Sequence, residues 1–201
     1  MRAKIITTLF LVLAVSQANA ATVNFEEFAV GDGAGPFPTV LTSQGYEFSG
    51  QAAPFASAEV LTGTNTGGTN AYGGSINGVG QDGFNVSAFV TIEKADGGAF
   101  AIQSLDYFLD ADSLGSTEIR GQLAGGGITF LSGVAVGTGD WLNLQSVTFR
   151  ADANGFGFGF ATAEIDNVML TAVPIPAAVW LFGSGLGMLG WMRRRQSNVA
   201  Q

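Results

Sequence analysis

The stretch GFGFGFATAEIDNVML, residues 155–170, has the alternation of side chains that decides the fold class. Successive side chains of a strand point to opposite faces, so Phe156, Phe158 and Phe160 share one face and the intervening glycines share the other. We expect the phenylalanines to fill the core. The bare glycine face would let another backbone or a ligand come close, and a crowded corner of a sheet is the interpretation that we favour.

Similar β-branched and aromatic runs recur along the central part of the chain, separated by clusters of glycine, asparagine and aspartate. No convincing helical period accompanies them, which is typical of an all-β protein. The expected strands cover residues 22–28, 40–48, 85–93, 99–109, 117–123, 128–136, 141–149, 155–162 and 165–170. Roughly nine short strands predict a sandwich or a barrel, and we favour a jelly-roll-like antiparallel β-sandwich over residues 21–172.

Residues 62–83 form a segment with eight glycines and few core-forming side chains. A loop of that length in a compact domain is usually functional, ordered by a metal or disordered. Tyr72 stands alone in this segment, where no core partner for it is evident. Aromatic rings stack on sugar rings, so Tyr72 and Trp141 are the candidate glycan-binding residues, and a packing role is the alternative.

The central domain is strongly acidic. Residues 21–172 contain three basic residues, Lys94, Arg120 and Arg150, against sixteen acidic ones, which is a net charge of −13. Like-charge repulsion opposes binding to nucleic acid and to anionic membrane surfaces. Divalent cations and neutral glycans are better candidate partners.

The chain contains no cysteine and no histidine. This composition removes disulfides, the usual zinc ligand and the Ser-His and Cys-His dyads, and we predict that the protein is not an enzyme. Paired carboxylates also serve glycosidases, but no pair stands out. A glycoside-active enzyme is therefore the weaker alternative.

Carboxylates offer the one site chemistry that the sequence supports. The first and last strands of a sandwich often lie side by side, which would gather oxygen ligands for a structural Ca²⁺ ion. The candidate ligands in and after these strands are Glu26, Glu27, Asp32, Asp166 and Asn167. A weaker second set is Asp106, Asp110 and Asp112. Neither spacing matches a fixed calcium loop, so solvated acidic residues are the alternative.

The first twenty residues, MRAKIITTLFLVLAVSQANA, read as a secretory signal peptide. Arg2 and Lys4 precede an apolar stretch, and Ala18-Asn19-Ala20 forms a small-x-small cleavage site. We expect cleavage after Ala20, so that residues 1–20 leave the mature protein.

The segment VPIPAAVWLFGSGLGMLGWMRRRQ, residues 173–196, begins with twenty uncharged, mostly apolar residues. Twenty helical residues at about 1.5 Å each span the roughly 30 Å hydrocarbon core of a bilayer. Arg193, Arg194 and Arg195 follow and predict a cytoplasmic C-terminus with the domain outside. We expect a transmembrane helix that holds the precursor at the inner membrane.

The order of short motif, apolar helix and arginine cluster near the chain end is that of a processing signal. VPIPAAVWLFGSG resembles the PEP-CTERM sorting tail of Gram-negative bacteria, in its Val-Pro-x-Pro variant. Val173, Pro174 and Pro176 match the motif, and Ile175 stands where the name-giving form has glutamate. The resemblance implies export across the inner membrane and recognition by exosortase, a membrane-embedded cysteine transpeptidase-like protease. It also implies association with exopolysaccharide and biofilm matrix.

Two short stretches, FEEF and EIDNV, resemble the first and last strands of secreted bacterial jelly rolls. By analogy with carbohydrate-binding modules, this similarity favours the sandwich and the calcium site. The sequence thus predicts an exported protein of the cell surface or matrix that exosortase sorts. A calcium-dependent carbohydrate-binding module and a simple membrane-anchored periplasmic domain are the alternatives.

Overall fold

The structure, a computed structural model, describes residues 20–32, 40–52, 56–57, 59–62, 66, 70–78, 86–153, 159–173 and 182–188. The chain forms two compact units: one is Ala18–Val173, and the other combines Met1–Gln17 with Pro174–Gln201. In the second unit, residues 182–188 are helical. Within the described residues, no helix has both the length and the apolar character to cross a bilayer. The expected transmembrane helix stays a prediction.

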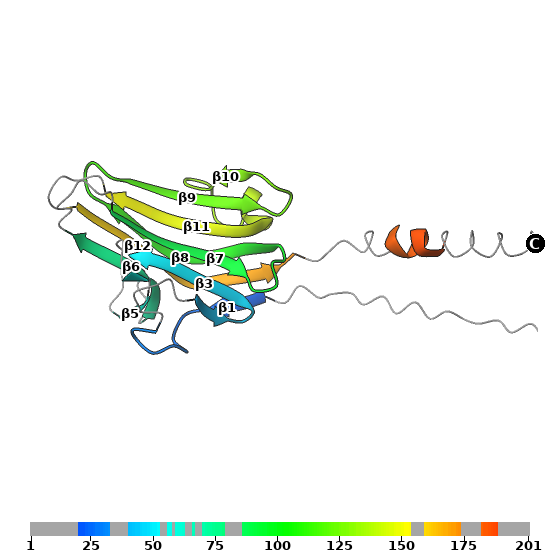
Figure 1. Ribbon diagram of the computed structural model, residues 1–201, viewed down its shortest axis with the longest axis horizontal. Coiled ribbons are helices and arrows are strands. Elements are labelled where there is room, and N and C mark those ends of the chain that lie inside the picture. The colour runs from blue at the N-terminus through cyan, green and yellow to red at the C-terminus, as the bar shows by residue number, and fades with distance from the viewer. Residues whose placement is uncertain are drawn as a thin grey trace, which may run out of the picture. The chain divides into compact units, whose positions relative to one another are not determined.

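The first unit is an all-β domain, as the alternation predicts. Its strands pair antiparallel in a curled sheet (Figure 1). A short 3-10 helix, η1, precedes β11. The elements are β1 (Ala20–Val23), β2 (Val40–Ser43), β3 (Tyr46–Ala52), β4 (Ala56–Ser57), β5 (Glu59–Thr62), β6 (Asn70–Gly78), β7 (Val86–Lys94), β8 (Phe100–Ala111), β9 (Ser116–Leu123), β10 (Ile128–Phe130), η1 (Gly139–Leu142), β11 (Leu144–Ala153) and β12 (Gly159–Ala172).

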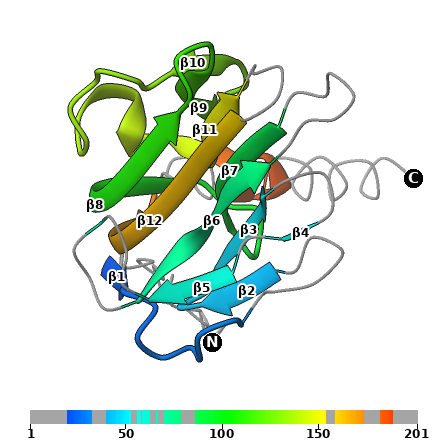
Figure 2. The ribbon, with the colours of Figure 1, turned by 90° about the vertical axis from the view of Figure 1, so that its left-hand side faces the viewer.

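The curled sheet folds over into two layers. The first layer has the order β2-β3-β7-β11-β9-β10, and the second has the order β8-β12-β6-β5, with β1 paired to β12. β11 joins β8 through the pair Leu144 and Phe100, where the sheet passes from one layer to the other. Figure 2 shows β8, β12 and β6 side by side in the second layer. The predicted sandwich-like arrangement is therefore confirmed at this level.

Alternating burial in the first layer places the core between the two layers. Val90 and Ile92 in β7 are fully buried, and so are Val147 and Phe149 in β11. The side chains between them point to the opposite face of the strands. The outer face of β7, β11 and β9 is therefore made largely of polar and charged side chains.

The described part of the quoted stretch, residues 159–170, lies in the second layer. Residues 159–162 and 165–170, expected in two strands, lie in one strand, β12, which pairs with β1, β6 and β8. Ala161, Ala163 and Ile165 are fully buried, so the alternation turns Phe160 outward, where it is 37% exposed. The expectation that Phe160 fills the core is wrong. Phe156 and Phe158 lie outside the described residues.

The glycine-rich segment contains a strand that the sequence did not predict. β6 pairs with β12 on one side and with β5 on the other. A Cβ atom on Gly73 would lie 2.2 Å from the carbonyl oxygen of Ala163. Close approach of the two backbones therefore requires glycine where a strand usually has a β-branched residue. The loop interpretation is wrong for residues 70–78.

The expected first strand ends at Val23, and a turn follows it. Phe25 has a φ of +56° in this turn, and its carbonyl oxygen accepts a hydrogen bond from the Phe28 N–H at 3.2 Å. The fully buried Phe25 ring lies 5.1 Å from the Phe48 ring and 5.7 Å from the Tyr72 ring, between centroids. The ring anchors the turn, which carries Glu26 and Glu27, to β3 and β6.

Candidate functional site

Asp106, Asp166 and Asn167 meet at an irregularity between β8 and β12, and we call them the bulge cluster. Asp166 pairs directly with Asp106, and the register shifts before Met169. Asn167 has a φ of +49°, and its Nδ2 donates to Asp106 Oδ2 at 2.9 Å. Its backbone N–H donates to Asp166 Oδ1 at 2.7 Å. The extra residue turns Asn167 outward, and bulges of this kind are common beside functional sites.

The carboxyl group of Asp166 is almost completely removed from solvent, with the residue 1% exposed. Its pKa is raised to about 6, chiefly by desolvation and also by the nearby negative charges of Asp106 and Glu26, against the opposing hydrogen bond from the Asn167 N–H. Burial and like charge both disfavour the ionised form. Asp166 therefore titrates closer to neutral pH than an ordinary aspartate.

The expected calcium ligands divide between different places. β1 does lie beside β12, as predicted for the first and last strands. The negative charge of Glu26 contributes to the raised pKa of Asp166. Glu26 also accepts a hydrogen bond from the Asn70 N–H at 3.1 Å. Glu27 instead accepts a hydrogen bond from the Ser43 hydroxyl, and Asp32 Oδ2 accepts one from the Ala29 N–H at 2.9 Å. Across the described ranges, no three acidic side chains form a group that could hold a metal ion.

The second expected set also divides. Asp106 belongs to the bulge cluster, whereas Asp110 and Asp112 bond to backbone groups close by in sequence. Asp110 Oδ1 accepts from the Ala111 N–H at 2.9 Å, and Asp112 Oδ1 accepts from the Leu114 N–H at 3.1 Å. Those two aspartates therefore stabilise the end of β8 and the turn after it.

The two candidate glycan-binding aromatics are core residues. Tyr72 is fully buried between Phe25 and Phe48, and burial raises its pKa. Trp141 is fully buried in η1, and its Nε1 donates to the Val134 carbonyl oxygen at 3.3 Å. Neither ring has a face that a sugar can reach. The glycan-binding role expected for both residues is wrong, because the layers close over them.

The sorting-tail residues lie mostly outside the described part of the chain. Val173 is described, and its N–H donates to the Ala99 carbonyl oxygen at 3.0 Å at the end of the compact unit. Pro174, Pro176, Arg193, Arg194 and Arg195 are not described. The compact unit therefore ends at the first residue of the tail, and the sorting motif stays a prediction.

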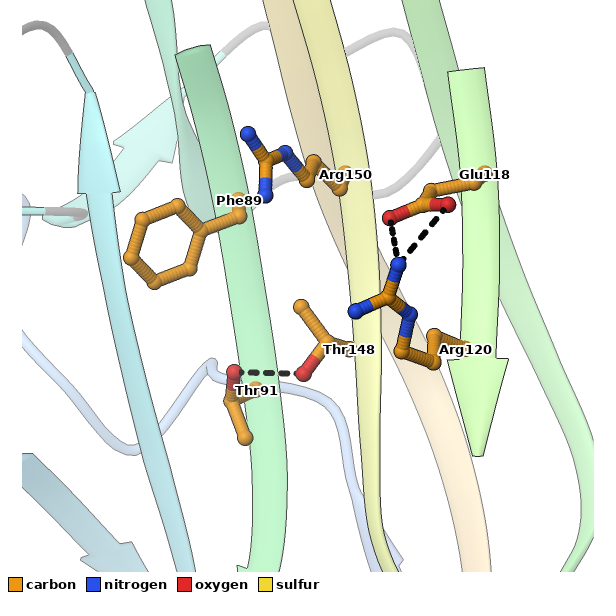
Figure 3. A pocket seen from close by; sticks show the side chains of 6 residues that line it. All are labelled: Phe89, Thr91, Glu118, Arg120, Thr148 and Arg150. Carbon is orange, nitrogen blue, oxygen red and sulfur yellow. Dashed lines mark hydrogen bonds and ion pairs between the residues drawn. The ribbon is translucent and has the colours of Figure 1, made fainter. Parts of the chain in front are cut away.

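An open hollow lies on the outer face of the first layer, and we call it the sheet-face hollow (Figure 3). Its volume is about 230 Å³. It is lined by Phe89 and Thr91 of β7, Thr148 and Arg150 of β11, and Glu118 and Arg120 of β9. A smaller hollow of about 120 Å³ continues over the same three strands at Glu93, Ser146 and Gln122.

Polar contacts order the floor of the sheet-face hollow. The hydroxyls of Thr91 and Thr148 lie 3.0 Å apart in a hydrogen bond. Arg120 Nη2 lies 3.2 Å from Glu118 Oε1, and Figure 3 shows this pair beside the two threonines. Arg150 Nε donates to Asp152 Oδ1 at 2.8 Å. The hollow thus offers hydroxyls, guanidinium groups and a carboxylate from three adjacent strands.

The three basic residues of the domain gather around these hollows. Arg120 and Arg150 line the larger one and Lys94 lines the smaller one. Sequence reasoning missed this site, although polar residues alternate with apolar ones at 146–152 and, except at Phe89, at 87–93. The alternation predicts that each strand has one polar face turned outward. It does not predict that β7 and β11 pair side by side, which is what joins the two polar faces. No family model, curated protein or solved structure was found to match the chain.

Proposed function

We propose that the chain is the precursor of an exported surface or matrix protein that an exosortase-type protein sorts through its C-terminal tail. The observation that carries the proposal is the order VPIPAAVWLFGSG, an apolar run long enough to span a bilayer, and three arginines. Association with exopolysaccharide or biofilm matrix is part of the proposal. The proposal also includes a signal peptide at residues 1–20, a transmembrane helix within residues 173–196 and a jelly-roll-like form of the sandwich.

The ends of the β domain support this organisation. The compact unit begins at Ala18 and ends at Val173, close to the expected limits of 21 and 172. Ala21 of β1 pairs with Leu170 of β12, so the chain enters and leaves the domain at neighbouring points. A non-enzymatic role fits a domain that has no histidine or cysteine.

Genetic removal of exosortase tests the proposal. The full chain is expressed in a Gram-negative host with exosortase and in a strain without it, and the membrane and released fractions are compared. We expect release that depends on exosortase and is lost in the double variant Pro174→Ala/Pro176→Ala. The matched control is Pro36→Ala/Pro38→Ala, which changes two prolines with the same spacing. Equal release from both strains would contradict the proposal, and retention in the membrane fraction of both strains would leave a plain membrane anchor.

A second candidate function is a calcium-dependent carbohydrate-binding module. The observation that favours it is the carboxyl group of Asp166, whose pKa is raised first by burial and then by repulsion from the charges of Asp106 and Glu26. Ca²⁺ prefers carboxylate and amide oxygens, and its charge would offset that repulsion. This candidate predicts retention on the producer's own exopolysaccharide in calcium and loss of retention in EDTA.

A further inference from the structure

We infer that the outer face of β7, β11 and β9 binds a neutral polysaccharide chain, with the sheet-face hollow at its centre. This inference deepens the proposed function by naming the class of partner, and it rests on export of the protein to a place where such chains occur. It assigns binding to side chains on the face of the first layer, apart from Tyr72, Trp141 and the bulge cluster.

The floor of the hollow has the groups that a sugar ring requires. A pyranose presents hydroxyls around its rim and C–H groups on its faces. Thr91 and Thr148 supply paired hydroxyls that can each donate and accept. Phe89, in the neighbouring row of β7, also lines the hollow (Figure 3). The hydroxyls fit the rim of the sugar and the aromatic ring fits its C–H face.

The ion pairs of this face are better explained by binding than by stability. Arg120 and Arg150 have side chains 46% and 42% exposed, and exposed ion pairs contribute little to the free energy of unfolding. Their carboxylate partners do hold the guanidinium groups in place before a ligand arrives, which lowers the entropic cost of binding. Each guanidinium has five N–H donors, and the partners among the described residues do not use all of them.

Charge selects a neutral ligand. The side chains of Glu118, Arg120, Arg150 and Asp152 carry two positive and two negative charges, so the centre of the face is balanced. The domain as a whole has a net charge of −13 and would repel an acidic polymer. A cationic polymer would be drawn to the acidic surfaces instead of to the place where the basic residues gather. A neutral, hydroxyl-rich chain meets neither obstacle.

The pairing of the strands also selects the kind of chain. Backbone groups of β11 pair with β7 on one side and with β9 on the other, so a peptide cannot add to this face as a further strand. Ligand contacts must come from side chains. The two hollows together cover three successive cross-strand rows, about 13 Å along the strands at 3.3 to 3.4 Å per residue. That length fits several linked sugars better than a single one.

Binding of neutral hexasaccharides to the full chain, purified in detergent, tests the inference. The probes are α- and β-linked hexamers of glucose, mannose and galactose, with a hexamer of galacturonate as the acidic probe. We expect at least one neutral hexamer to bind, and its Kd to be unchanged by EDTA. Thr91→Val/Thr148→Val and Phe89→Ala should each weaken that binding about 10-fold, through lost hydrogen bonds or lost ring contact.

Matched controls lie on β12 in the other layer. Thr171→Val and Phe160→Ala change the same residue types and should alter the Kd less than about 2-fold, well under 1 kcal/mol. Arg120→Gln, at an exposed position, tests the face again if a threonine or phenylalanine variant does not fold. The inference is overturned if no neutral hexamer binds, if galacturonate alone binds, or if folded variants of the hollow bind as the unchanged chain does. Such a failure leaves exosortase-dependent release untouched, so the two proposals fail separately.

Discussion

At the scale of single residues, the most informative side chain is Asp166. A buried carboxylate opposite another aspartate is costly when ionised, and the pKa of about 6 expresses that cost. Its folded-state pKa lies above the usual value of 3.8, so the folded protein holds this proton more tightly than the unfolded chain. The contribution of Asp166 to stability is therefore favourable at low pH and is lost as the pH rises from about 4 to about 6.

The variant Asp166→Asn should remove this pH dependence. An amide keeps an oxygen that can accept from the Asn167 N–H and carries no charge. We expect the free energy of unfolding to rise by about 1 to 3 kcal/mol at pH 8 and to change little at pH 4. Urea titrations at both pH values measure the difference.

The control for this prediction is Asp110→Asn. Asp110 is exposed, and it lies on the same face of β8 as Asp106, the residue that pairs with Asp166. It should change the free energy of unfolding by less than about 0.5 kcal/mol at either pH. A variant of Asp166 that is destabilised at pH 8 would show that its ionised carboxylate has a favourable partner.

Gly73 carries a second prediction at this scale. A Cβ atom there would meet the backbone of Ala163 and Glu164 at 2.2 and 2.7 Å, and backbone atoms cannot move aside cheaply. Gly73→Ala should lower the free energy of unfolding by about 2 kcal/mol or more. Gly125→Ala, which meets no atom within 4 Å, should have little effect. Equal melting temperatures for the two variants would contradict the close approach of β6 and β12.

At the scale of elements, strands with β-branched and aromatic residues were predictable and β6 was not. β7, β8, β9 and β11 all overlap the expected runs, because their inward side chains must be large and apolar to fill the core. β6 meets its neighbours through small residues, which read as a loop when the neighbour is unknown. The position of Tyr72 in the core follows from the same pairing.

The turn after β1 joins elements that are far apart in the sequence. Phe25 contacts Phe48 of β3 and Tyr72 of β6. Phe25→Ala should lower the free energy of unfolding by about 3 to 5 kcal/mol, because it empties a fully buried site. Phe130→Ala, at a 61% exposed position on the edge strand β10, should cost less than about 1 kcal/mol. Similar losses in the two variants, measured by urea unfolding, would contradict the anchor role of Phe25.

At the scale of the whole molecule, charge divides the protein into unlike surfaces. Lys94, Arg120 and Arg150 lie around the hollows of the first layer. The pairing of the strands brings Asp106 and Asp166 together in the second layer. The sequence showed the three basic residues but could not place them on one face, because Arg120 and Thr91 belong to strands that meet only through β11. The sequence also showed which carboxylates were candidate ligands. It could not show that they bond to different partners in different parts of the domain.

The calcium candidate makes a prediction for the intact protein. Binding to the folded state alone raises the melting temperature, so millimolar CaCl₂ should raise it by several degrees relative to EDTA. The double variant Asp106→Asn/Asp166→Asn should show no such rise. An unchanged melting temperature of the full chain on addition of calcium would contradict this candidate and leave the sorting proposal standing.

The proposed sorting makes the most direct claim about the molecule as a whole, because it states which residues the mature protein lacks. The decisive measurement is the intact mass of the protein recovered from the surface or medium of an exosortase-positive host. We predict a mass without residues 1–20 and without the residues that follow the Pro174–Pro176 region. A mass that still includes WMRRRQ, residues 191–196, would contradict it.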